Sequence, residues 1–497
     1  MEREEIRVQY SGLIIFTAQL LSVATGLAFN LLLTRNLSKQ EFGIWTNIFD
    51  LTSYFTILAG LFPFWAVRFM ARGREGVTKA VVASNFAVGA VSVALYLVLV
   101  FPVTAALGVS SALIIMYALA SVQIINVHLI GALESIIRAK KPQVIGVGLL
   151  ISEGSKVTLA YVIAVASGQV FLGAMLGFLI GGVLQTLYYM KLLSLDFRHP
   201  IHWGYIREWA KGSAASIFGM VGSQFANFVF ILLFVYGGHG AARADYQAAA
   251  TFAAVIGYAS SLALALYPKL LAQSCFEEVA LSLRLMLMFA LPMTVLAVVM
   301  SSSLLTILDV SYSSASPVLV VLAVDALVVV LVNFYLFVVM GTEKLDEKAT
   351  IHLGTLVRSK IFKANSISYI QAAMTLPLVL YVVTSVAANS SQLALYFAAI
   401  MLLTHIVLLA VTYAWTIRAC RVTFPWVSVG KYLLASGVAG VLLFLLPHPT
   451  TVILTLTMLV GGVGLYAAIL VLIDKYARGL VLEIARQLLK VLRRKSD

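Results

Sequence analysis

The feature that most constrains this chain is a series of fourteen long apolar runs that fill most of the sequence. About 20 residues at 1.5 Å per residue cross the ~30 Å hydrocarbon core of a bilayer, and each run is about that long. The connections between the runs are too short to form domains. The sequence therefore predicts an all-α polytopic membrane protein. The expected helices cover residues 10–34, 43–67, 79–103, 109–131, 143–166, 169–191, 212–236, 245–267, 281–305, 316–340, 364–388, 391–416, 427–446 and 450–473.

Composition supports this fold class and excludes several functions. Hydrophobic residues make up 61% of the 497 residues, whereas soluble domains have roughly 45–50% apolar residues. The net charge of +13 would suit a nucleic-acid partner. The basic residues lie in short loops between the apolar runs, however, so we expect no nucleic-acid partner. No Walker loop, dinucleotide fingerprint, zinc cluster or catalytic triad is visible. We therefore expect no cofactor, no metal and no catalytic residue, and hence a protein that is not an enzyme.

The distribution of Lys and Arg predicts the orientation. Of the 34 basic residues, almost all fall in the termini and in alternate loops, which defines one side of the membrane. The other side has only Arg35, Lys39 and Arg243, and Lys156 lies inside a run. Cytoplasmic loops are rich in Lys and Arg, so both termini are expected in the cytoplasm of a cell-membrane protein. The first run is too long for a signal peptide and lacks a clear cleavage site, so we interpret it as a retained span.

Weak internal similarity predicts two matched lobes. Residues 107–110 and 308–311 precede the fourth and tenth runs with similar letters, and Gly12 and Gly212 open the first and seventh. Parallel repeats of this kind occur in alternating-access transporters. The predicted organisation is an N-terminal six-helix lobe at 1–191, a cytoplasmic linker at 192–211, a C-terminal six-helix lobe at 212–416, two additional transmembrane helices at 417–473 and a cytoplasmic basic amphipathic tail at 474–497.

Three runs carry a stripe of small and polar residues at helical spacing. The stripes comprise Gln19, Ser22, Gly26 and Asn30 on the first run, Gly43, Asn47, Asp50 and Tyr54 on the second, and Ser216, Ser223 and Asn227 on the seventh. Such a stripe must face protein or water, because lipid satisfies no hydrogen bonds. One interpretation is helix–helix packing, since small and amide residues join helices in membranes. Their occurrence on corresponding runs of two halves favours a hydrated central cavity.

Charged residues lie well inside three of the apolar runs. A charge at mid-bilayer costs about 3 kcal/mol or more, so each needs a partner or a function. Glu153 and Lys156 are three residues apart on one helix face and are expected to pair, either to fix packing or to serve transport. Asp50 and Asp325 have no partner visible in sequence. We expect these carboxylates, with Glu153, to be candidates for coupling to a proton or sodium ion.

Three arginines stand at the ends of runs, and two histidines lie within runs. Arg35, Arg68 and Arg243 either extend toward the interface or recognise a diphosphate, for which the planar guanidinium is well suited. His128 and His405 have no second ligand at metal spacing. We expect both histidines to be packing residues.

The turn after the first run resembles that of a known family. Residues 35–43 match the Arg-x-Leu-x-x-x-Glu-Phe-Gly turn of the polysaccharide-transporter (Wzx-type) branch of the multidrug/oligosaccharidyl-lipid/polysaccharide exporter superfamily. The Arg68 end of the second run and the basic turn at 138–142 resemble the same branch. This resemblance implies a flippase that moves undecaprenyl- or dolichyl-linked sugars to the outer leaflet. It also implies a cation-lined cavity between two six-helix lobes.

The resulting hypothesis is a lipid-linked oligosaccharide flippase whose lobes rock about a cavity lined by the first, second, seventh and eighth spans. The expected site comprises Gln19, Asn30, Asn47 and Asn227 for sugar hydroxyls, and Arg35, Arg68, Lys156 and Arg243 for the pyrophosphate. The expected partners are a polyprenyl-linked oligosaccharide, membrane lipids and a proton or sodium ion, and the expected state is a monomer.

Two other functions stay open. A cation-coupled multidrug antiporter of the same superfamily would use the same architecture, although the arginines argue mildly against cationic drugs. A membrane-embedded glycosyltransferase or polymerase is disfavoured, because such enzymes usually need a sizeable extracytoplasmic loop. The outer loops here, such as 167–169 and 447–450, are only a few residues long.

Overall fold

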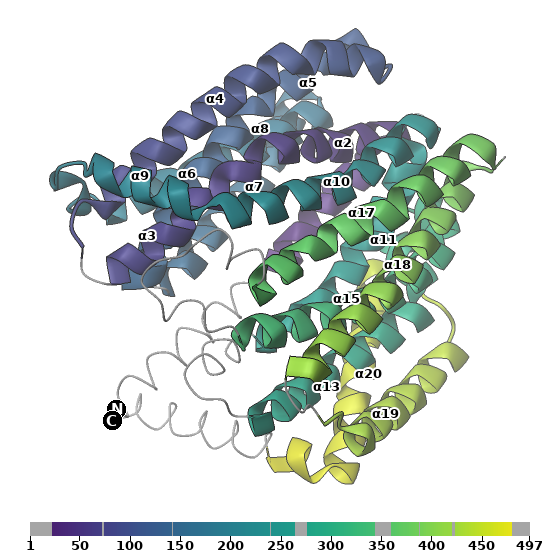
Figure 1. Ribbon diagram of the computed structural model, residues 1–497. Helices are drawn as coiled ribbons and strands as arrows, with labels where there is room; N and C mark the ends of the chain where they lie inside the picture. The colour runs from purple at the N-terminus through teal and green to yellow at the C-terminus, as the bar shows by residue number, and fades with distance from the viewer. Residues whose placement is uncertain are drawn as a thin grey trace, which may run out of the picture. The chain divides into compact units, whose positions relative to one another are not determined.

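The computed structural model describes residues 22–71, 74–141, 143–238, 240–263, 276–342, 359–386, 388–419 and 423–479, and within these ranges the regular structure is helical (Figure 1). After a helix at 22–36, the α-helices are α2 (Lys39–Thr56), α3 (Leu61–Ala71), α4 (Val77–Ala106), α5 (Ser111–Leu119), α6 (Ser121–Lys140), α7 (Gln143–Ser167), α8 (Val170–Leu192), α9 (Trp203–Gly212), α10 (Ala214–Tyr236), α11 (Ala241–Gly257), α13 (Phe276–Val299), α14 (Ser301–Leu308), α15 (Ser316–Gly341), α17 (Lys360–Ser385), α18 (Ser390–Ala419), α19 (Trp426–Leu445) and α20 (Val452–Ile473). Short 3-10 helices η1 (Ile57–Gly60), η2 (Asp196–Arg198), η3 (Tyr258–Ala263) and η4 (Val310–Ala315) join several of them.

The membrane architecture expected from the sequence is confirmed. The described residues contain 12 helices long and apolar enough to cross a membrane, and each coincides with one of the fourteen predicted spans. The two remaining predicted spans, 10–34 and 245–267, run into residues outside the described ranges. The chain is therefore a multi-pass α-helical membrane protein.

The polar turn between the first two spans is as short as predicted. The first described helix ends at residue 36, and α2 begins at Lys39. Ser38 caps α2 through a reciprocal pair of hydrogen bonds with Glu41. The Glu41 N–H donates to the Ser38 hydroxyl at 3.2 Å, and the Ser38 N–H donates to the Glu41 carboxylate at 2.9 Å. This capping box satisfies backbone donors that a helix start leaves open, so it fixes where α2 begins.

The second span bends within its length. It runs through α2, tightens into η1, and continues as α3. Pro63 lies in the first turn of α3, where a missing N–H is tolerated, so the span continues past it.

The chain divides into two compact units. The first comprises Met1–Ala244, Thr350–Arg358 and Asn365–Leu393, and the second comprises Asp245–Ala349, Ser359–Ala364 and Ala394–Asp497. Helices α10 and most of α17 therefore belong to the first unit, and α13, α15, α19 and α20 belong to the second. The lobe boundaries at 191 and 212, based on sequence repeats, stay a prediction.

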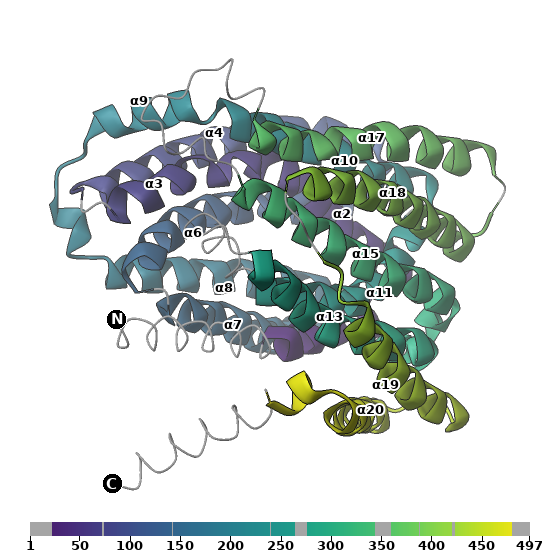
Figure 2. The ribbon, with the colours of Figure 1, turned by 60° about the horizontal axis from the view of Figure 1, so that its bottom comes forward.

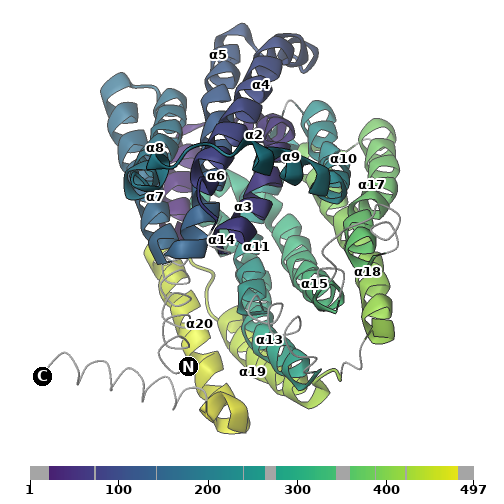
Figure 3. The same cartoon turned by 60° about the vertical axis from the view of Figure 1, so that its left-hand side comes forward.

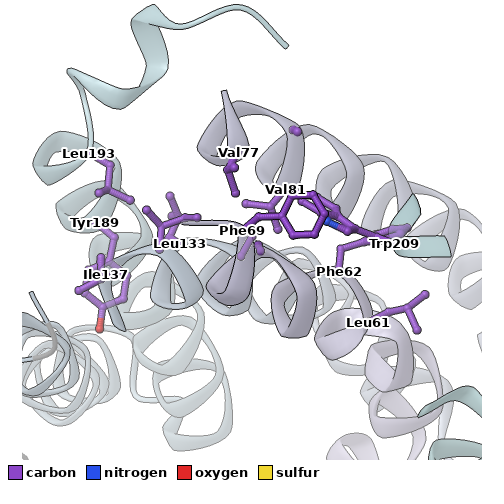
Figure 4. Close-up of a cluster of buried hydrophobic side chains, with 14 residues drawn as sticks. Leu61, Phe62, Phe69, Val77, Val81, Leu133, Ile137, Tyr189, Leu193 and Trp209 are labelled. Atoms are coloured by element: carbon purple, nitrogen blue, oxygen red, sulfur yellow. The ribbon is translucent and has the colours of Figure 1, made fainter. Parts of the chain in front are cut away.

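A buried apolar cluster holds one end of the first unit together (Figure 4). It joins α3, α4, α6 and the end of α8 to α9, the amphipathic helix in the linker. Trp209 of α9 is fully buried and meets the Phe69 ring edge-on, with ring centroids 5.6 Å apart. Helix α9 therefore lies against α3 and α4, as Figure 2 also shows. The linker is anchored to the first unit.

Helices α7 and α8 pack unusually closely, and Figure 3 shows them side by side. Gly173, Gly177 and Gly181 form a stripe on α8 that faces α7. A Cβ on Gly177 would lie only 2.5 Å from the Ala160 backbone nitrogen and 2.7 Å from the Lys156 carbonyl oxygen. Small residues let membrane helices approach in this way. The stripe brings the α8 backbone against Lys156.

In the second unit, α13 packs on α15 and α19, and α19 packs on α20. A charged cluster closes the end of this group. An Arg284 N–H donates to both Asp474 carboxylate oxygens, at 2.8 and 3.0 Å, and Lys431 lies 3.5 Å from the same group. Burial raises the pKa of Asp474, but the Ala477 and Tyr476 N–H groups and the charges of Arg284 and Lys431 outweigh it. The pKa therefore falls below the usual 3.8.

Candidate functional site

The first unit contains a buried ion pair between α2 and the start of α11. Arg243 donates through Nε to Asp50 Oδ2 at 2.8 Å and through Nη2 to Asp50 Oδ1 at 2.9 Å. The two side chains are 5% and 15% exposed, respectively. The guanidinium also lies 4.8 Å from the Phe230 ring centroid, within cation–π range. Arg243 is thus a buried partner of Asp50 and does not extend toward the membrane interface.

Close backbone contact positions this pair. Gly43 lies two turns before Asp50 on α2, and Gly240 precedes Arg243 by three residues. A Cβ on Gly43 would lie 2.2 Å from the Gly240 carbonyl oxygen, so only glycine fits there. Gly240 itself has a φ of 95°, which disfavours any other residue. The two glycines let the first turns of α2 and α11 approach closely enough for the bidentate pair.

The second ion pair lies on α7, where the sequence predicted it. Lys156 Nζ is 2.6 Å from Glu153 Oε2, and both side chains are largely buried. The Thr25 hydroxyl donates to the same Glu153 oxygen at 3.3 Å. The Lys156 ammonium also faces the Phe29 ring at 5.0 Å and the Phe178 ring at 5.9 Å. The predicted pairing of Glu153 with Lys156 is confirmed.

A cluster of aromatic rings lies beside the Glu153–Lys156 pair. Its members are Phe29, Trp45, Phe49, Phe171 and Phe178, from helix 22–36, α2 and α8. Phe49 and Phe178 meet edge-on at 4.9 Å, and Trp45 meets Phe49 at 5.0 Å. Phe49 directly precedes Asp50, and Phe178 faces Lys156. The candidate site therefore comprises two cations that each contact a carboxylate, and the aromatic cluster adjoins the one at Lys156. Sequence reasoning missed these rings because they lie in ordinary apolar runs.

Polar groups on α2 add hydrogen-bonding capacity beside this cluster. The Tyr117 hydroxyl donates to Asn47 Oδ1 at 2.7 Å, while the buried Asn47 Nδ2 has no partner among the described residues. One turn beyond Asp50, the Ser53 hydroxyl donates to Gln224 Oε1 at 3.2 Å. Gln224 was not among the residues expected from the sequence, although it lies on the seventh span with Asn227.

The other predicted binding residues have varied environments. Asn30 is half-buried on helix 22–36, Arg35 is exposed at the end of that helix, and Asn227 is exposed on α10. Gln19 and the side chain of Arg68 lie outside the described residues. The structure pairs Asp50 with Arg243 and Glu153 with Lys156, and it places Asn47 one turn before Asp50 on α2.

The second unit holds the remaining predicted carboxylate. Asp325 on α15 lies 2.6 Å from His405 Nδ1 on α18, and both side chains are nearly buried. The expectation that His405 only packs is wrong, since its ring satisfies a buried carboxylate. Sequence reasoning missed the pair because the partners are 80 residues apart. His128 instead contacts the Ile124 carbonyl oxygen through Nδ1. The described residues contain no cluster of three or more His, Cys, Asp or Glu that could hold a metal.

This arrangement permits anion exchange. Arg243 and Lys156 each contact a carboxylate through bonds that a phosphate oxygen could also accept. A phosphate that displaced Asp50 or Glu153 would leave that carboxylate without the cation that it contacts here, and able to bind another cation.

Comparison with known proteins locates the fold. No family model matches the sequence, and no curated protein matches it. Among solved structures, a lipid II flippase, MurJ, in an inward closed conformation is similar at a TM-score of 0.66 and 15% identity, over 94% of this chain and 100% of the other. An inward-facing multidrug resistance MATE family transporter of the MOP superfamily is similar at a TM-score of 0.61 and 11% sequence identity. The match covers 82% of this chain and 98% of the other.

A third solved structure is a MOP superfamily transporter from Pyrococcus furiosus, described as having a binding pocket of reversed polarity. It is similar at a TM-score of 0.55 and 15% identity, over 83% of this chain and 95% of the other. Identities this low demonstrate a shared fold only. The chain shares the fold of these three membrane transporters.

Proposed function

We propose that the chain is a flippase that translocates a lipid-linked oligosaccharide across the cytoplasmic membrane by alternating access, for surface polysaccharide or glycoprotein biosynthesis. The observation that carries this proposal is that two buried cations, Arg243 and Lys156, each contact a carboxylate. A diphosphate linkage is the part of such a substrate that two cations would recognise. The similarity to the flippase also extends over more of this chain than the similarity to the multidrug transporter, 94% against 82%.

In the proposed cycle, the substrate diphosphate displaces Asp50 from Arg243 and Glu153 from Lys156. Arginine suits this exchange because its fork binds a carboxylate or a phosphate with the same two bonds. The exchange replaces one anion by another, so the buried cations are never left without a counter-charge. This avoids the several kcal/mol that an unpaired buried charge would cost.

Sugar recognition falls to the polar and aromatic side chains nearby. Asn47 has an unpartnered amide N–H group within the described residues, which can donate to a hydroxyl. Asn30, Asn227, Gln19, Arg35 and Arg68 complete the proposed binding set from the sequence prediction. The aromatic rings offer flat apolar surface that matches the C–H face of a sugar ring.

The displaced carboxylates provide a route to ion coupling. Asp50 or Glu153, once released by its cation, would bind a proton or sodium ion and carry it as the lobes rock. Asp325 is a third coupling candidate, held by His405 in the second unit. Both termini are proposed to lie in the cytoplasm, and the working state is proposed to be a monomer.

A cation-coupled multidrug antiporter is the second candidate function. The same observation can be interpreted differently, because Asp50 and Glu153 would then bind a cationic drug after releasing their partners. Solved structures of multidrug transporters with the same fold keep this alternative open.

Reconstituted proteoliposomes distinguish the two functions. A polyprenyl diphosphate oligosaccharide on one leaflet becomes accessible to an added glycosidase on the other if the chain is a flippase. Arg243→Gln and Lys156→Gln should each reduce that rate at least tenfold. Arg418→Gln is the matched control, because it removes one exposed charge at the end of α18. Ethidium efflux without movement of the oligosaccharide would reject the flippase and support the antiporter.

A further inference from the structure

A polar pocket lies at one end of the first unit, away from the aromatic cluster. Its volume is ≈ 270 Å³, and its walls come from the α3–α4 turn, the end of α6 and the linker. The lining residues are Met70, Arg74, Glu75, Gly76, Thr78, Lys140, Asp196 and His199. A pocket of this size has ample room for a phosphate group, and nothing in the proposed transport cycle uses it.

The floor of the pocket is the N-terminus of α4. Gly76 occupies the cap position with a φ of 71° and no side chain, so the helix has no side-chain cap. The first N–H groups of the 30-residue helix α4 lack that usual acceptor. The partial positive charge of a helix start favours an anion at this position.

A second, independent feature is the Thr78 hydroxyl. Thr78 lies in the first turn of α4, is 1% exposed and lines the pocket. Its Oγ1 is buried and has no hydrogen-bond partner within the described part of the chain. A buried hydroxyl without a partner costs about 1–3 kcal/mol. A ligand oxygen that accepts a hydrogen bond from this hydroxyl would relieve that cost.

The charges around the pocket suit an anion that makes several bonds. Lys140 pairs with Asp196, and His199 lies 3.5 Å from Glu75, so both lining carboxylates already have a basic neighbour. Arg74 makes only a loose contact with Glu208, at 4.0 Å. Its guanidinium stacks 4.4 Å from the Phe69 ring, which orients its N–H groups. Arg74 and the helix start therefore supply the positive potential of the pocket.

The walls of the pocket also lie at the ends of candidate membrane spans. Candidate spans begin at Val77, end at Lys140 and end at Leu192, so all three walls coincide with span ends. On the adjoining linker, Leu195 and Trp203 are 67% and 68% exposed, as apolar residues that insert into a membrane interface would be.

We propose that this pocket binds a phosphate group, held by Arg74, the Thr78 hydroxyl and the α4 N-terminus. Its position at the span ends makes the phosphodiester of an anionic lipid such as phosphatidylglycerol the favoured source, and inorganic phosphate the other. Binding would join the linker, α4 and α6. This site is independent of the transport substrate and stands whether the chain moves an oligosaccharide or a drug.

Native mass spectrometry of the purified full chain tests the proposal. Phosphatidylglycerol and phosphatidylcholine are titrated separately into detergent micelles, and inorganic phosphate is added as competitor against chloride at equal ionic strength. Arg74→Gln and Thr78→Val should each weaken binding of one phosphatidylglycerol about tenfold, the loss of one charge-assisted bond. Thr78→Ser should restore it, and Lys141→Gln is the matched control, because Lys141 neighbours Lys140 but does not line the pocket.

The outcomes separate the sources. Tight phosphatidylglycerol binding that phosphate displaces assigns the site to a lipid headgroup. Phosphate binding that depends on Thr78 and Arg74, with no preference for phosphatidylglycerol, assigns it to a soluble phosphate. Equal binding by the native chain and both variants, each with an unchanged unfolding midpoint without ligand, overturns the proposal.

Discussion

Breaking the Asp50–Arg243 pair is the sharpest perturbation of the first unit. Asp50→Asn leaves the Arg243 guanidinium, only 5% exposed, without its counter-charge. Removing one partner of a buried ion pair typically costs about 3–5 kcal/mol. Because the Asp50 side chain is still 15% exposed, water compensates part of the loss, and we expect about 3 kcal/mol. Arg243→Gln should cost about the same, since it leaves the carboxylate unpaired.

The double variant D50N/R243Q removes both charges and lets the two amides bond to each other. We expect it to cost no more than about 2 kcal/mol, well below the sum of the single costs. The measurement is the free energy of unfolding in mixed micelles titrated with SDS. Asp474→Asn combined with Arg243→Gln serves as the control, because the two sites share no partner and should add within about 0.5 kcal/mol. Additive costs for D50N and R243Q would refute the pairing.

Three further predictions concern other contacts. Gly43→Ala should destabilise the chain by about 1–3 kcal/mol in the same assay, because its Cβ would overlap the Gly240 carbonyl oxygen at 2.2 Å; an unchanged value would show that α2 can shift freely. His405→Ala should cost about 1–3 kcal/mol by leaving Asp325 without its ring partner, whereas Asp325→Asn with His405→Ala should recover part of that loss. Asp474 has a pKa below 3.8 when folded, so its stabilising charge is complete above about pH 4 and disappears as the pH falls through that lowered pKa; Asp474→Asn should therefore destabilise the chain at pH 7 and differ less from the native chain near pH 3.

The fold could be predicted from the sequence because membrane spans are local features. Twenty apolar residues form a helix in lipid whatever surrounds them, and the capping box at Ser38 is encoded within four residues. The tightening of the second span into η1 could not be predicted from the apolar run that contains it.

The candidate site could be predicted only where its contacts are local. Glu153 and Lys156 share a helix face, so their pairing followed from spacing. Asp50 and Arg243 are 193 residues apart, and no pattern in one sequence joins them. Arg243 is next to a span end, so the sequence suggests an interfacial residue, and only the fold brings it to Asp50. The aromatic cluster gave no signal, because its rings look like ordinary core residues.

The central claim is that Arg243 and Lys156 exchange their carboxylates for the diphosphate of a lipid-linked oligosaccharide. Its most direct test is the rate at which reconstituted chain exposes a polyprenyl diphosphate oligosaccharide to glycosidase on the opposite leaflet. The account predicts fast exposure by the native chain, and at least a tenfold slower rate for Arg243→Gln and for Lys156→Gln at equal protein levels. Equal rates for the native chain and both variants would contradict it.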